Sequence, residues 1–428
     1  MDFILNLNKY LSKSFVNELL DSMEEKKTSS LILNTKKIDE SSFLNLFPHL
    51  RKHPFLKYVY YYNKDEYDLG KNYLLIAGAY YIMDASSLIT SSLLDVNDGD
   101  LILDMCAAPG GKTISLLLYN LDKKFEVISN DISHSRALEL SKNIERIGAS
   151  NVIVTNNDFS LIKNKYKNTF NKIILDAPCS GSAMFRKNEL AKKDWTIEKV
   201  LSLKEKQILL LNDAIYMLQD GGIIVYSTCS FSYEEDEEVL LEVLKVNPNI
   251  HLINIPFKEG FYKDNNVKEP IHLFPNLYEG EGQFIALLKK DGTDKKYDLS
   301  IKKEEKSKDL NRFNLNFNRQ ITLKDKIYLT NNPLDLSKLN LIRPGLEVYE
   351  VKKNYLTPSF SLAHYLNNKA SIELNEKEKD LYLHGDEITK ALNLKNDFYL
   401  VSYKGINLGF IKYVNGKLKN YYPKGLRH

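Results

Sequence analysis

The chain has 428 residues, room for two to four domains of ordinary size, and its 43% hydrophobic and 27% charged residues are typical of a globular protein. No apolar run is long enough to span a bilayer, so we expect no membrane partner. The total net charge of +3 is too small to indicate a class of partner. An odd count of three cysteines, without a signal-peptide pattern, argues against a disulfide framework and favours a reducing cytoplasm.

The N-terminal segment, residues 1–70, predicts a small α+β module. Apolar and polar side chains interleave over residues 1–15, which is typical of an amphipathic helix. The run SLILNTKK at residues 30–37 predicts a strand.

Residues 71–290 alternate strand-like and helical patterns. Five apolar runs, LILDM, FEVIS, NVIVT, KIILD and GIIVY, begin at residues 101, 125, 151, 172 and 222, and helical patterns such as 133–148 separate them. This alternation predicts an α/β domain with a mainly parallel sheet and helices on both faces. A final apolar run at residues 282–290 predicts an edge strand of the same sheet.

The rest of the chain predicts a linker and two smaller modules. Residues 291–310 are polar and charge-rich, as in a linker, and residues 311–374 form a first C-terminal module. Residues 375–428 predict a small β-rich module in which a strand pair turns at Lys404 and Gly405.

The C-terminal end is basic. From Lys404 to His428 there are six Lys or Arg and no acid, with aromatic residues between them. Such a pattern suits contact with RNA phosphates and base stacking, and a solvated basic surface is an equally open interpretation. The candidate RNA contacts there are Lys412, Lys417, Lys419 and Lys424.

All three cysteines follow strand-like runs. Cys179 stands in DAPCSG, Cys229 in STCSFS and Cys106 in DMCAAPGGKT. Residues at the strand ends of an α/β sheet face the crevice where such folds bind ligands, and a thiol there can attack an electron-poor carbon. A single free cysteine is more often an inert buried residue, so the case depends on the surrounding motifs.

The motif around Cys106 predicts a cofactor site. It reads as a strand, a glycine turn and a helix start, and Gly110 and Gly111 let the backbone approach a ligand closely. Residues 106–113 also match a phosphate-binding P-loop, except that Cys106 replaces the first glycine. Because that glycine shapes the loop, the mismatch disfavours a nucleotide triphosphatase.

Three aspartates follow successive predicted strands. Asp131 lies nineteen residues past Lys112, where a carboxylate can accept hydrogen bonds from ribose hydroxyls. Asp158 and Asp176 end the next two strands. Each alone is more often a turn or cap residue, but three of them line one edge of the sheet. The pattern therefore favours a nucleoside cofactor.

Together the motifs DMCAAPGGKT, NDIS, DAPCSG and YSTCSFS resemble those of the NOL1/NOP2/Sun family of RNA cytosine carbon-5 methyltransferases. The resemblance covers most of the chain. The stretch PCSGSAMFRKN and the ending LGFIKYVNGKLKNYYPKGLRH are most similar to the bacterial branch that methylates small-subunit (16S) ribosomal RNA. The resemblance implies a Rossmann-like S-adenosylmethionine-dependent methyltransferase domain, an N-terminal RNA-binding module and a C-terminal PUA-like RNA-binding module.

The resemblance also assigns residues. It implies that Cys229 is the nucleophile, that Cys179 helps to release the methylated RNA, and that Asp176 lies between cofactor and target base. Asp131 would hold the ribose and Asp158 would sit by the adenine. The cofactor loop would comprise Cys106, Ala107, Ala108, Pro109, Gly110, Gly111 and Lys112.

Four other positions follow the motifs or depart from the family pattern. Arg186 and Lys187 follow the Pro-Cys loop and are open to two interpretations, RNA phosphate contact or a solvated pair. Met83 stands where the family often has Gln, and Asp236 where it usually has Asn. We expect a monomer without a metal ion.

The chemistry explains why thiols are needed. Carbon 5 of cytosine is a poor nucleophile, and a thiolate that adds to carbon 6 activates it towards a methyl sulfonium. The base must leave its stack to reach such a pocket. The alternatives are a non-catalytic RNA-binding ribosome assembly factor that retains the fold, the same chemistry on tRNA, and the disfavoured P-loop nucleotidase.

Overall fold

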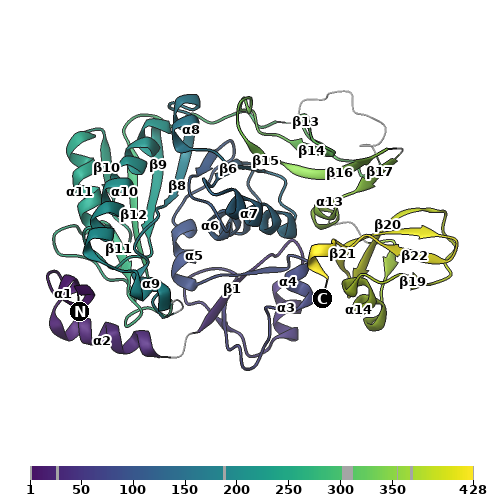
Figure 1. Cartoon of the computed structure of the whole chain (residues 1–428), viewed down its shortest axis with the longest axis horizontal. Helices are drawn as coiled ribbons and strands as arrows, with labels where there is room; N and C mark the ends of the chain where they lie inside the picture. The colour runs from purple at the N-terminus through teal and green to yellow at the C-terminus, as the bar shows by residue number, and fades with distance from the viewer. Residues whose placement is uncertain are drawn as a thin grey trace.

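The computed structural model describes residues 2–25, 28–186, 189–300, 312–353, 355–366 and 370–427. A nine-stranded sheet forms the centre of the molecule (Figure 1), in the order β10-β12-β9-β8-β5-β6-β7-β15, with β11 paired to β12. Its strands are β5 (Leu101–Asp104), β6 (Glu126–Asn130), β7 (Val152–Thr155), β8 (Phe170–Asp176), β9 (Leu218–Thr228), β10 (Ile250–Ile253), β11 (Ile271–Leu273), β12 (Gln283–Lys290) and β15 (Leu341–Pro344). Strands β5 to β9 are parallel, as predicted, and β10, β11, β12 and β15 run antiparallel to their neighbours.

Helices cover both faces of this sheet. One apolar core joins one face to α5 (Ala85–Ser92), α6 (Gly111–Tyr119) and α7 (His134–Ile147). A second core joins the other face to α8 (Phe159–Lys165), α10 (Ile197–Met217) and α11 (Glu237–Val246). Strands buried on both sides are continuous apolar runs, which is why the five runs were readable from the sequence. The short η1 (Ser182–Met184) and α9 (Glu189–Lys193) follow the Pro-Cys loop.

Both edges of the sheet differ from the prediction. The run predicted as an edge strand, now β12, lies inside the sheet, because the short β10 pairs with its outer side. At the opposite edge, β15 from the predicted first C-terminal module pairs with β7 and covers its open hydrogen-bonding groups.

Part of the predicted linker packs against the central domain. Lys296 bonds with Asp100 there, and the backbone of Lys295 accepts a hydrogen bond of 2.7 Å from Asn171. This segment therefore lies against the amino ends of β5 and β8, while residues 301–310 lie outside the described part of the chain.

The N-terminal segment forms two helices where one was predicted, α1 (Asp2–Leu7) and α2 (Lys13–Glu24). The side chain of Ser12 caps α2 by accepting a hydrogen bond from the backbone of Phe15, so a new helix begins there. A small sheet follows, in the order β2-β3-β1-β4. Its elements are β1 (Ser29–Leu33), α3 (Glu40–Leu46), β2 (Arg51–Lys52), β3 (Val59–Tyr62), α4 (Tyr73–Ile76) and β4 (Tyr80–Ile82).

Two further sheets make up the C-terminal part. The first has the order β13-β14-β16-β17, and the second β18-β20-β21-β22-β19. Their elements are β13 (Arg319–Leu323), β14 (Lys326–Thr330), β16 (Leu346–Lys352), β17 (Tyr355–Pro358), α13 (Phe360–Tyr365), β18 (Ile372–Glu373), α14 (Glu376–His384), β19 (Ile388–Thr389), β20 (Asp397–Tyr403), β21 (Ile406–Val414), β22 (Lys417–Asn420) and η2 (Lys424–Leu426). Lys404 and Gly405 form the turn between β20 and β21 with positive φ, which confirms the predicted strand pair.

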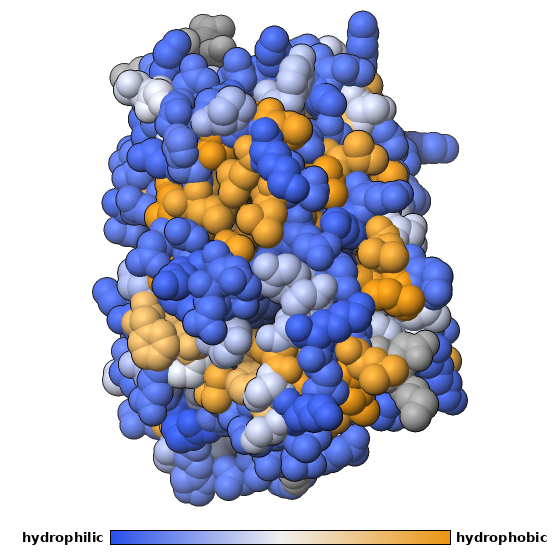
Figure 2. All heavy atoms as spheres, turned by 90° about the vertical axis from the view of Figure 1, so that its left-hand side faces the viewer, coloured by the Kyte–Doolittle hydropathy of each residue, from blue (hydrophilic) through white to orange (hydrophobic). Residues whose placement is uncertain are grey.

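The N-terminal sheet and the last sheet share one apolar core, in which Tyr60 and Tyr80 belong to the same cluster as Tyr382 and Tyr422. Figure 1 accordingly shows α3 and α4 beside the C-terminal module. On the opposite side, the face that carries α1 and α11 is mostly hydrophilic with separate apolar areas (Figure 2), and Leu241 and Val246 of α11 are exposed. Among the described helices, none combines the length and the apolar character needed to cross a membrane.

Candidate active site

The predicted site residues meet at one edge of the central sheet. Because β5, β6, β8 and β9 are parallel, their carboxyl ends point the same way and bring together Asp104, Asp131, Asp176 and Cys229. Cys106 and Cys179 follow directly on β5 and β8 in the loops above that edge. The site is thus assembled from segments more than 120 residues apart in the chain.

The cofactor loop has the backbone conformation that its glycines predict. Gly110 has φ of +112°, in the left-handed region, and α6 begins at the next residue. A Cβ on Gly111 would lie 2.9 Å from the sulfur of Met83, so the side chain of Met83 packs closely against the start of α6. Met83, which stands where the family resemblance led us to expect Gln, thus packs on the loop.

Asp131 holds the same loop through hydrogen bonds to its backbone. Its buried carboxylate accepts hydrogen bonds from the backbone of Ala108 at 3.3 Å and of Ser133 at 2.9 Å, and Arg136 lies 3.5 Å from it. Asp158 instead caps α8: its carboxylate accepts hydrogen bonds from the hydroxyl of Ser160 at 2.5 Å and from the backbone of Ser160 at 2.9 Å, and these two bonds lower its pKa. Contact of Asp131 with a ribose and of Asp158 with an adenine stay predictions.

A pocket of about 220 Å³ opens between the cofactor loop and β4. Its lining is Tyr81, Ile82, Met83, Ser87, Asp104, Cys106, Ala107, Ala108, Pro109, Gly111, Lys112 and Asp176. Burial raises the pKa of Asp104 to about 7, and burial also raises the pKa of Cys106. Among the described residues Asp104 Oδ1 has no hydrogen-bond partner, although its side chain is buried. An unsatisfied carboxyl oxygen beside a glycine turn fits the ammonium group of an amino-acid-bearing nucleoside cofactor.

Asp176 lines this pocket, and three side chains hold its carboxylate in place. Its carboxylate accepts hydrogen bonds from Lys112 Nζ at 2.6 Å, Ser227 Oγ at 2.7 Å and Gln283 Nε2 at 3.1 Å. Burial lowers the pKa of Lys112, but the charge of Asp176 more than reverses this, so the pKa is raised overall. Lys112 therefore stays cationic and also interacts electrostatically with Cys229.

The two predicted catalytic thiols are in contact. Cys179 Sγ lies 3.0 Å from Cys229 Sγ, and the backbone N–H of Cys229 donates to Cys179 Sγ at 3.3 Å. The hydrogen bond with Cys229, together with burial, raises the pKa of Cys179 well above its usual value. Cys179 is consequently a protonated thiol at neutral pH.

Two residues and one helix at this edge of the sheet were not predicted from the sequence. Gln283 begins β12 and reaches Asp176, and Glu235 bonds with the loops of both thiols. Helix α1 reaches the same region, where Asn6 donates to Glu234 at 2.7 Å. The acidic run after Tyr233 did not signal these contacts, because acidic residues are ordinary at the start of a helix, where the helix dipole favours them.

The candidate RNA contacts divide into two groups. Arg186 turns inward and bonds with Glu281 at 3.3 Å and with the backbone of Ser22 and Gly280 at 3.2 Å, so RNA contact, still a prediction, would require it to leave these partners. Lys187 lies outside the described residues. Lys412 and Lys419 pair across β21 and β22 and so share one face, Lys417 forms an ion pair with Glu387, and Lys424 lies in η2.

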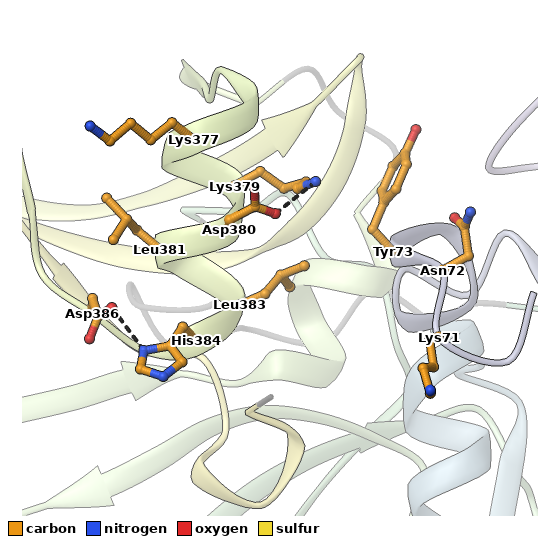
Figure 3. Close-up of a pocket in the computed structure, with 10 residues that line it drawn as sticks. All are labelled: Lys71, Asn72, Tyr73, Lys377, Lys379, Asp380, Leu381, Leu383, His384 and Asp386. Atoms are coloured by element: carbon orange, nitrogen blue, oxygen red, sulfur yellow. Dashed lines mark hydrogen bonds and ion pairs between the residues drawn. The ribbon is translucent and has the colours of Figure 1, made fainter. Parts of the chain in front are cut away.

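A larger hollow lies away from this site. It has a volume of about 670 Å³ and runs between α14 and residues 71–73 (Figure 3). Lys379 pairs there with Asp380, and His384 with Asp386, so its charges are mixed. None of the thiol or cofactor residues lines it.

Asp236, Glu237 and His272 are a group of described residues whose ligand atoms lie close together. Glu237 and His272 already form a hydrogen bond of 2.6 Å with each other.

Known proteins are similar in sequence to most of this chain. The family described as 16S rRNA methyltransferase RsmB/F matches residues 91–289, and the Methyltransferase RsmF PUA domain matches residues 369–428. Ribosomal RNA small subunit methyltransferase F of Vibrio parahaemolyticus is 30% identical over 84% of this chain and 81% of its own length. The protein of that name from Shewanella piezotolerans is 28% identical over 93% of this chain and 90% of its own length.

Solved structures show the same fold. A methyltransferase homolog from Pyrococcus horikoshii superimposes with a TM-score of 0.56 at 27% identity, over 65% of this chain and 92% of its own. NSun6 from Pyrococcus horikoshii, solved with SFG, reaches a TM-score of 0.60 at 20% identity, over 68% of this chain and 98% of its own.

The fold and the pocket therefore define an S-adenosylmethionine-dependent methyltransferase with a C-terminal PUA domain. More narrowly, the chain belongs to the RsmB/F family of 16S rRNA methyltransferases.

Proposed function

We propose that this enzyme methylates carbon 5 of cytidine in 16S rRNA through a covalent bond between Cys229 and the base. The observation that carries the proposal is the contact of two thiols, 3.0 Å apart, beside Asp176 and the cofactor pocket. One thiol would be enough to add to carbon 6. A second thiol in contact with it suits a mechanism in which the first must also be released.

Cys229 is the nucleophile because it stands in the Thr-Cys motif, and Cys179 Sγ lies 3.0 Å from its sulfur as the second thiol. The sulfur of Cys229, as thiolate, forms a bond to carbon 6, and the electrons of the carbon 5–carbon 6 double bond move towards ring nitrogen 3. Lys112 supplies the nearby positive charge that a thiolate needs. Asp176, fixed by Lys112, Ser227 and Gln283, accepts a hydrogen bond from the cytosine amino group and so orients the ring for attack.

S-adenosylmethionine, when bound, supplies an electrophilic methyl group to carbon 5. Residues of the cofactor loop and Asp104 would hold it, with the ribose at Asp131. Carbon 5 then loses its proton to solvent, the double bond re-forms, and the bond between carbon 6 and Cys229 breaks with its electrons returning to sulfur. Cys179, as a thiol, donates a hydrogen bond to the departing thiolate and so assists release.

The substrate assignment rests on the family and on the C-terminal module. The relatives are named for methylation of small-subunit ribosomal RNA, and the PUA domain adds a basic sheet face with Lys412 and Lys419. The loops at the thiols would accept a base only after it leaves its stack, which costs least in an RNA that is not fully paired.

Bisulfite sequencing of RNA from cells with and without this gene tests the proposal. Deletion should make at least one cytidine of 16S rRNA convert where it was protected, and the intact gene, but not Cys229→Ala, should restore protection. A change confined to tRNA would contradict the rRNA assignment and keep the chemistry. Unchanged conversion at every cytidine would contradict the function itself.

A further inference from the structure

Five consecutive acidic residues, 234–238, follow the Thr-Cys loop, and four of them are buried. Three of the buried ones have local roles. Glu234 accepts from Asn6, Asp236 from Thr228, and Glu237 bonds with His272. Glu235, which has no exposed surface, is different because its bonds reach both thiol loops at once.

The carboxylate of Glu235 joins the residues that follow the two cysteines. Its Oε1 accepts hydrogen bonds from the backbone of Ser180 at 2.8 Å and from Gln207 Nε2 at 3.0 Å. Its Oε2 accepts from the hydroxyls of Ser180 and Ser230, the latter at 2.6 Å. Ser180 comes directly after Cys179 and Ser230 directly after Cys229. One buried group thus holds the loop of β8 against the loop of β9.

We propose that Glu235 is a positioning residue that keeps Cys179 in contact with Cys229; the value of this contact for release rests on the proposed function. A buried carboxylate is costly unless every lone pair is matched by a donor, and Glu235 has four donors from three segments of the chain. These hydrogen bonds go to the residues after the sulfurs rather than to the sulfurs. Its contribution is therefore geometric rather than a proton transfer.

The geometry predicts which substitutions are tolerated. In Glu235→Gln the amide oxygen can still accept from Ser180 N–H and Gln207, while the amide nitrogen donates to the two serine hydroxyls, which can rotate. Glu235→Ala removes all four bonds and frees the loops. Ser230→Ala removes one of the four donors to Glu235, together with the contacts of Ser230 Oγ with Ser180 Oγ and Ser232 N–H, and is a milder variant should the alanine at 235 impair folding. Glu234→Gln changes a neighbouring buried acid that contacts Asn6 and neither thiol loop.

The first experiment measures how fast the two thiols form a disulfide in the absence of RNA and cofactor. Diamide, a diazene oxidant, is added to the purified protein; the two thiols lose two protons and two electrons, a disulfide forms, and diamide is reduced to its hydrazine. Peptide mass mapping gives the rate for the 179–229 pair. We expect Glu235→Gln and Glu234→Gln to react like the parent, Ser230→Ala to be slower by roughly tenfold and Glu235→Ala by about a hundredfold, since a loss of about 1 Å in alignment costs this much.

The second experiment measures methyl transfer to RNA. The kcat of Glu235→Ala should fall by about a hundredfold with an unchanged KM for S-adenosylmethionine, and Glu235→Gln should restore it without a change in the pH profile. Equal disulfide rates in the parent, Ser230→Ala and Glu235→Ala would overturn the proposal. So would a Gln variant as slow as the Ala variant, since that would mean the negative charge matters. If the disulfide rates behave as expected but no variant, nor the parent, methylates RNA, the proposed function fails and the positioning role stands.

Discussion

The carboxyl edge of the central sheet and the outer face of the C-terminal sheet are both polar, but they are built in opposite ways. At the edge, Asp104, Asp131 and Asp176 are held by fixed partners, and the first two are buried. On the C-terminal face, Lys419 is exposed and Lys412 half-buried over aromatic rings. A buried group loses a specific bond when changed, whereas an exposed charge acts through a field that salt screens. Chemistry and affinity should therefore separate when the two regions are mutated.

The largest effect expected concerns Asp104 and pH. Its raised pKa of about 7 means that between about pH 4 and pH 7 the unfolded chain releases this proton while the folded chain keeps it. The free energy of unfolding therefore falls as pH rises through that window, by up to about 4 kcal/mol from this group alone. Asp104→Asn should lose this part of the pH dependence, as urea titrations from pH 4.5 to 8 would show. Parallel stability curves for the two proteins would contradict the burial argument.

Asp176 tests the chemical half of the comparison. Asp176→Asn should lower the rate of methyl transfer by about a hundredfold, because the carboxylate that orients the cytosine amino group is removed. Binding of S-adenosylmethionine should change far less, since many other groups line the pocket. Single-turnover kinetics and calorimetry on the same preparation separate the two. A fall of less than tenfold would remove Asp176 from the chemistry.

Asp131 tests whether the carboxyl edge of the sheet also binds the cofactor. Asp131→Ala should weaken binding of S-adenosylmethionine by roughly ten- to a hundredfold, which corresponds to about 1.5–3 kcal/mol for a charged acceptor. Calorimetry would measure it. Unchanged affinity would leave Asp131 only its role in holding Ala108 and Ser133. Tight binding of ATP by the parent protein would revive the P-loop interpretation of residues 106–113.

The smallest effect is expected on the C-terminal face. Lys412→Ala with Lys419→Ala should weaken RNA binding by roughly tenfold at moderate salt and lower the log–log salt slope by about 1.4 units, if each contacts one phosphate. Lys417→Ala should matter less, because Lys417 is already paired with Glu387. Affinity for S-adenosylmethionine should stay the same. An unchanged slope in the double variant would show that this face is only a solvated surface.

The sequence predicted the parts of the molecule that depend on local patterns. The five parallel strands are continuous apolar runs, and the thiols and aspartates that follow them meet at one edge, as expected for parallel strands. The turn at Lys404 and Gly405 was readable for the same reason, since a left-handed turn needs particular residues.

The parts that were missed depend on pairing between distant segments. The partners of Glu235 come from the loops after β8 and β9 and from α10, and no local pattern connects Ser180, Gln207 and Ser230. Strand β15 pairs with β7 although almost 190 residues separate Leu341 from Thr155, and its short run resembles a loop. The break between α1 and α2 depends on a serine cap within an otherwise helical pattern. Arg186 reads as a surface residue because its buried partner, Glu281, is far away in sequence.

The central claim, that Cys229 attacks the base and Cys179 assists release, is tested most directly by trapping the enzyme on its RNA. Parent protein, Cys179→Ala, Cys229→Ala and the double variant are incubated with 16S rRNA and S-adenosylmethionine and run on denaturing gels. The account predicts that only Cys179→Ala accumulates a denaturation-stable protein–RNA adduct, which the further loss of Cys229 abolishes. An adduct that accumulates in Cys229→Ala, or methyl transfer that survives without Cys229, would contradict it.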